Sequence, residues 1–83
     1  MDKDIVFTTE SILNGMAKIA VIYHDEDDTW QALPLDDFSV ENGRIIAMST
    51  LLKLDSSIKE ILTLDKGYKA VKEGEKWIIY QEI

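Results

Sequence analysis

The segment at residues 18–24 constrains the fold more than any other part of the chain. It reads KIAVIYH, a nearly continuous run of apolar and largely β-branched residues. A run of this kind is typical of an interior strand of a sheet with both faces covered. It is too short to cross a bilayer, and 83 residues are enough for one domain. We therefore expect a single domain spanning residues 1–83, with this strand at its centre.

Other strand-like segments surround this run, and turn residues separate them. They are DIVFTT at 4–9, TWQALPL at 29–35, RIIAMS at 44–49, YKAVKE at 68–73 and KWIIYQ at 76–81. Pro34 has no amide hydrogen, so it should end its strand or lie at a sheet edge. Asn42 and Gly43 can take positive φ and mark a turn.

The last two strands form a predicted hairpin that turns at Gly74. With Gly74 and Glu75 as a two-residue turn, Glu73 pairs with Lys76. The same register places Val71 opposite Ile78.

Two segments have helical character. ESILNG at 10–15 fits one or two turns, with Thr8 or Thr9 as the cap and Gly15 at the end. TLLKLDSSIKEILTL at 50–64 fits a helix that breaks near Asp55, where Asp55, Ser56 or Ser57 can cap the second part. The sequence thus predicts an α+β fold, with a mainly antiparallel sheet of about five or six strands and two short helical segments packed on it.

The charge is strongly asymmetric along the chain. Residues 1–43 contain ten acidic and two basic residues, a net charge of −8, whereas residues 44–83 have a net charge of +1. Nucleic acids and anionic membranes are unsuitable partners, since binding them requires clustered Lys and Arg. A basic protein is the partner that this charge favours.

The acidic residues concentrate around Trp30. The candidate partner-binding residues are Asp25, Glu26, Asp27, Asp28, Trp30, Asp36 and Asp37. One interpretation is a contact surface, in which the indole is a hot spot for a partner rich in Lys and Arg. Another is a solvated turn between two strands. Trp30 itself fits either a core or an exposed position, whereas Trp77, beside Ile78 and Ile79, is expected in the core.

We expect neither a metal site nor a catalytic site. A calcium-binding loop beginning at Asp25 would need glycine at Trp30 and glutamate at Asp36. The chain has no cysteine, so thiolate metal sites and disulfides are excluded. His24 is the only histidine, and no nucleophile motif or nucleotide-binding loop accompanies it. No cofactor is expected.

Three stretches resemble the immunity protein thirty-three family of bacterial polymorphic toxin systems. They are KIAVIYHDEDDTW, RIIAMSTLLKLDSSIKEIL and DKGYKAVKEGEKW, and the likeness covers residues 5–80 in element order. The chain differs from the family pattern at Thr29, where glycine is usual, and in a shorter acidic stretch before Arg44.

The resemblance implies a non-enzymatic protein that binds and neutralises a toxin domain by covering its active site or substrate groove. The alternative is a small accessory or regulatory domain that binds a protein unrelated to toxins. We expect a cytoplasmic protein, because the N-terminus has no basic region followed by an apolar core. The expected state is a monomer or a weak dimer.

Overall fold

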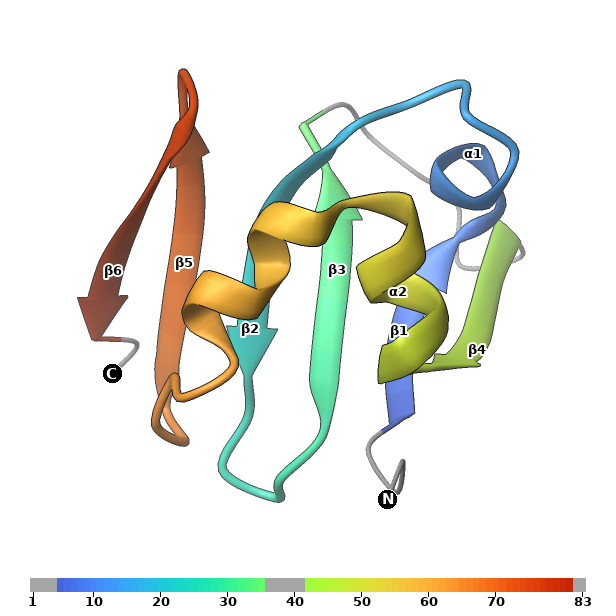
Figure 1. The fold of residues 1–83 in the computed structure, drawn as a ribbon. Helices are drawn as coiled ribbons and strands as arrows, with labels where there is room; N and C mark the ends of the chain where they lie inside the picture. Colours follow the sequence, from blue (N-terminus) through green and yellow to red (C-terminus); the bar gives the residue numbers. More distant parts are fainter. Residues whose placement is uncertain (1–4, 36–41, 82–83) are drawn as a thin grey trace.

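The computed structural model describes residues 5–35 and 42–81, which form one layer of sheet and one layer of helix (Figure 1). In chain order the elements are β1 (Ile5–Thr9), α1 (Glu10–Leu13), β2 (Ile19–His24), β3 (Trp30–Pro34), β4 (Gly43–Ala47), α2 (Met48–Leu54), the 3-10 helix η2 (Ser56–Ile61), β5 (Tyr68–Glu73) and β6 (Lys76–Gln81). The predicted α+β class is confirmed.

The sheet has six strands in the order β4-β1-β3-β2-β5-β6. Four of its pairings are antiparallel, and the pairing of β1 with β3 is parallel, so the sheet is mixed. The β5–β6 hairpin has the predicted register, with Glu73 opposite Lys76 and Val71 opposite Ile78. Pro34 is the last residue of β3, an interior strand between β1 and β2, so it ends the strand and does not mark an edge.

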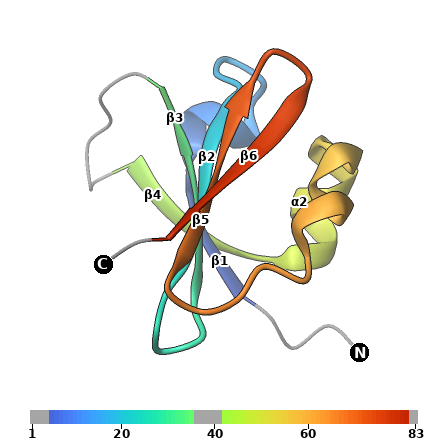
Figure 2. The ribbon, with the colours of Figure 1, turned by 90° about the vertical axis from the view of Figure 1, so that its left-hand side faces the viewer.

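The helices α2 and η2 cross one face of the sheet, as Figures 1 and 2 show. Buried apolar side chains from both layers form the core, among them Val6, Ile22, Trp30, Ala32, Met48, Leu51, Ile58, Ile61 and Ala70. Neither α2 nor η2 covers the other face of the sheet, which we call the open face.

The expectation that β2 is covered on both faces is therefore wrong. Ile22 and His24 point into the core and are buried, whereas Val21 and Tyr23 alternate with them and are half-buried on the open face. Both faces of β2 thus carry apolar side chains, although α2 and η2 cover only one of these faces.

The helical break predicted at Asp55 separates α2 from η2. The Asp55 carboxylate accepts hydrogen bonds from the backbone N–H of Ser57 at 3.0 Å and from its hydroxyl at 2.7 Å. Lys72 lies 3.6 Å from the other carboxylate oxygen. Partial burial tends to raise the pKa of Asp55, but the Ser57 hydrogen bonds and the Lys72 charge outweigh burial and hold that pKa below its ordinary value.

This lowered pKa predicts a specific loss of stability in acid. The stabilisation by the Asp55 charge is fully present above the pKa of the unfolded chain, about 3.9, and disappears as the pH falls through the lower folded-state pKa. Asp55→Asn should therefore show a smaller acid-induced decrease in unfolding free energy than the wild type, measured by urea unfolding between about pH 2 and 7. The exposed Asp65→Asn is the control. Identical pH profiles for wild type and Asp55→Asn would contradict this prediction.

Candidate protein-binding site

The acidic segment forms a tight turn that joins β2 to β3. The N–H of Asp28 donates to the carbonyl of Asp25 at 2.9 Å, and the N–H of Asp25 donates to the carbonyl of Thr29 at 2.8 Å. Asp28 has a φ of 70°, a left-handed conformation that aspartate tolerates better than most residues. This is the three-residue hairpin loop in which a type I turn precedes a left-handed residue. Glu26, Asp27 and Asp28 are all exposed on it.

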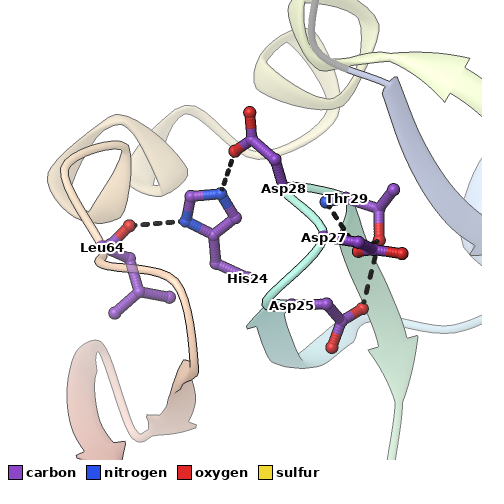
Figure 3. Close-up of polar contacts among 6 residues, drawn as sticks. All are labelled: His24, Asp25, Asp27, Asp28, Thr29 and Leu64. Carbon is purple, nitrogen blue, oxygen red and sulfur yellow. Dashed lines mark hydrogen bonds and ion pairs between the residues drawn. The ribbon is translucent and has the colours of Figure 1, made fainter.

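Hydrogen bonds within the turn hold two of the carboxylates in place (Figure 3). The hydroxyl of Thr29 donates to Asp27 at 2.6 Å, and its backbone N–H donates to the same oxygen at 3.2 Å. These two bonds hold the pKa of Asp27 below its ordinary value. The side-chain amide of Gln31 donates to Asp25 at 2.7 Å. The turn therefore presents negative charge in a defined geometry.

His24 connects the turn to the segment that precedes β5. Its Nδ1 lies 2.7 Å from the carbonyl oxygen of Leu64, and its Nε2 lies 2.7 Å from Oδ1 of Asp28 (Figure 3). The carbonyl can only accept, so Nδ1 donates. The N–H of Gly67 also donates to the His24 carbonyl at 2.7 Å. His24 is thus a buried structural residue with both ring nitrogens engaged.

Trp30 does not lie on the surface. It is 3% exposed, and its ring stacks on the His24 ring with centroids 3.9 Å apart and an interplanar angle of 8°. The interpretation of Trp30 as an exposed hot spot is therefore wrong, and its alternative as a core residue is correct. The physical reason is its place on an interior strand, on the face that α2 and η2 cover.

Trp77, expected in the core, lies instead at the periphery. It is half-buried and packs against the core cluster. Its Nε1–H donates to the hydroxyl of Ser57 at 3.0 Å, and the Lys72 ammonium lies 4.7 Å from a ring centroid of the indole. Trp77 is on the edge strand β6, where fewer neighbours can cover it.

A shallow apolar depression lies on the open face next to the acidic turn. Its volume is about 230 Å³, and it is lined by Ile5, Phe7, Thr29, Trp30, Gln31 and Ile45. Ile5 and Ile45 are 51% and 69% exposed. Thr29 both lines the depression and binds Asp27 of the turn. Thr29 therefore links the acidic turn to the apolar depression, and we call the two together the turn–depression surface.

Sequence reasoning missed the apolar part of this surface. Ile5 and Phe7 alternate with Val6 along β1, so both faces of the first half of the strand are apolar, which is a signal for an apolar second face. The sequence did not show which face of β1 would stay uncovered, because the strands that neighbour β1 could not be identified from it. Asp36 and Asp37, the remaining candidate contact residues, lie outside the residues that the structure describes.

The described parts of the chain lack two further features. Within residues 5–35 and 42–81, no three His, Cys, Asp or Glu side chains come together in a way that could hold a metal ion. No helix in those ranges is long and apolar enough to cross a membrane.

Comparison with known proteins found no relative of this chain. No family model, no curated protein and no solved structure matches the chain. The likeness to the immunity protein thirty-three family therefore rests on the motifs of the sequence alone.

Proposed function

We propose that this protein is a non-enzymatic binding protein whose turn–depression surface takes a basic protein partner. Supporting this is Thr29, which lines an exposed apolar depression and binds Asp27 of the acidic turn. A row of carboxylates alone is compatible with a solvated turn, but an adjoining exposed apolar patch adds a surface that gains free energy when it is covered.

The two parts of the surface have separate roles in the proposed complex. Glu26, Asp27 and Asp28 attract a positively charged partner during diffusional encounter. Ile5, Phe7 and Ile45 then supply apolar contact that slows dissociation. Because Thr29 already holds the Asp27 carboxylate with two hydrogen bonds, that side chain loses little conformational entropy on binding.

The partner that we propose is a bacterial toxin domain, as the family resemblance implies. A basic toxin, for example one that binds nucleic acid, has a positive active-site surface that matches this negative one. Covering that surface would exclude the substrate without any chemistry by the immunity protein. This proposal is tested by co-purification with the toxin domains encoded in neighbouring genes. Failure of the folded protein to bind any of them would contradict it, and specific capture of a host protein would favour the regulatory alternative.

Neutralising the turn should slow association without unfolding the protein. Glu26→Gln with Asp27→Asn removes two exposed charges and keeps an oxygen acceptor at position 27 for Thr29. We expect the association rate with the basic partner to fall roughly three- to tenfold at low salt and the difference to shrink at high salt.

A matched control removes the same charge elsewhere. Glu60→Gln with Glu75→Gln changes two exposed carboxylates on η2 and on the β5–β6 turn, away from β3. The association rate of this variant should stay within about twofold of the wild type. Equal rates for the two double variants at low salt, measured by stopped flow, would exclude the proposed role of the turn.

A further inference from the structure

The strand β6 is an edge strand with unusual composition. It is the last strand of the sheet and pairs within the described chain only with β5. Ile78, Ile79 and Tyr80 are 36%, 53% and 44% exposed, so apolar side chains reach solvent on both faces of the strand. Edge strands are normally protected by charge, proline or a bulge. Between Lys76 and Gln81 the only charge is Lys76 at the start, and the register with β5 is regular.

The hairpin geometry determines which backbone groups of β6 point away from β5. Gly74 has a φ of +65° and Glu75 does not have positive φ, which is the pattern of a type II′ turn. In such a two-residue hairpin, Glu73 and Lys76 exchange both hydrogen bonds, and bonded pairs then recur at every second residue. Ile78 and Tyr80 therefore direct their backbone groups toward β5. Trp77, Ile79 and Gln81 direct theirs outward.

We propose that a second copy of this chain pairs with the β6 edge, antiparallel and with its two-fold axis at Ile79. This register places Ile79 opposite Ile79 of the second copy as a hydrogen-bonded pair. Trp77 and Gln81 of the two copies then form the flanking bonded pairs. All outward backbone groups of the strand find partners, and one sheet continues through both copies.

Side chains on both faces match in this register. On the open face, Ile78 of one copy lies opposite Tyr80 of the other, and the symmetry repeats this aromatic–aliphatic pair. On the helix-covered face, the two Ile79 side chains, each 53% exposed in one copy, meet at the axis. The strand is therefore complementary to itself, which a two-fold interface requires.

The charge distribution also favours this edge for self-association. The chain has a net charge of −7, yet the hairpin from Tyr68 to Gln81 contains three lysines and two glutamates. Two copies that meet here do not bring their acidic turns into the interface. The other edge, β4, has five residues, begins with Gly43 and carries Arg44, which pairs with Glu10. The dimer also leaves the turn–depression surface free, since the depression lies at the β1–β4 end of the sheet.

Sedimentation equilibrium from about 1 µM to 1 mM tests the dimer directly. We expect the mass to rise from 9.5 kDa toward twice that value as concentration increases. Ile79→Lys places like charges opposite each other at the axis, so dimerisation should weaken by roughly tenfold or more. Ile45→Lys adds the same charge to the β4 edge and should not change the dissociation constant. A wild type that stays monomeric throughout, or an equal effect of both variants, would overturn the proposal.

Two further experiments test the register itself. Mixing Ile79→Lys with Ile79→Glu should give a heterodimer tighter than either homodimer, because residue 79 then faces an opposite charge. The chain has no cysteine, so Ile79→Cys should form a crosslinked dimer on mild oxidation, and Ile45→Cys should not. Equal crosslinking at both positions, or no gain on mixing, would overturn the two-fold axis at Ile79. Circular dichroism confirms that each variant is folded.

Discussion

Replacing Trp30 with alanine should lower the free energy of unfolding by about 3–5 kcal/mol. The indole is 3% exposed in the core, and its removal leaves a cavity beside the His24 ring on which it stacks. A domain of this size has a total stability of about 5–15 kcal/mol, so the variant should be close to unfolding at 37 °C. Urea denaturation followed by circular dichroism measures the change.

The second tryptophan provides the control. Trp77→Ala removes a half-buried ring on an edge strand, together with its hydrogen bond to Ser57, and should cost less than Trp30→Ala. In Trp77→Phe, Trp30 is the only indole, and its fluorescence should be blue-shifted and resistant to acrylamide quenching. Strong quenching, or a larger loss of stability at Trp77 than at Trp30, would contradict the observed placement of the two rings.

Replacing His24 with alanine is the second substitution with a large expected effect, about 2–4 kcal/mol. It removes the stack on Trp30 and the contacts with Leu64 and Asp28 together. His24→Phe separates these contributions, since phenylalanine can keep the stacked ring but cannot form either hydrogen bond. We expect His24→Phe to recover part of the stability and to remain about 1–3 kcal/mol below the wild type.

Tyr23→Phe is the matched control for this pair. Tyr23 is the adjacent aromatic residue, half-buried on the open face, and the removal of its hydroxyl should change stability by less than about 0.5 kcal/mol. If His24→Phe were as stable as the wild type, the hydrogen bonds to Leu64 and Asp28 would have no role in holding the acidic turn. His24 would then contribute through ring packing alone.

The His24 contacts also bear on binding. They connect the β2–β3 turn to the segment before β5, so the orientation of the acidic residues depends on a buried side chain that touches no partner. His24→Phe should therefore slow association with a basic partner when it is measured at a temperature at which the variant is folded. This effect distinguishes the ordered acidic turn from a loop whose geometry is irrelevant.

Much of the local structure could be predicted from the sequence alone. The break at Asp55, the Thr9 cap of α1, the tight turn at Gly74 and the register of the β5–β6 hairpin all depend on residues a few positions apart. Side-chain capping and turn conformations act over such distances and leave recognisable residue patterns. The concentration of acidic residues between β2 and β3 is likewise a property of the sequence.

Only the tertiary structure decided where the surfaces lie. The sequence could not tell that β3 lies between β1 and β2, and this position buries Trp30 and places Pro34 in the interior of the sheet. Nor could it tell that α2 and η2 cover one face and leave Ile5, Phe7 and Ile45 on the other. Strand order and helix placement follow from contacts between residues far apart in the chain, and alternation along a strand gives two faces without saying which one is covered. The acidic turn could therefore be located from the sequence, whereas the apolar depression beside it emerged only when distant strands were brought together.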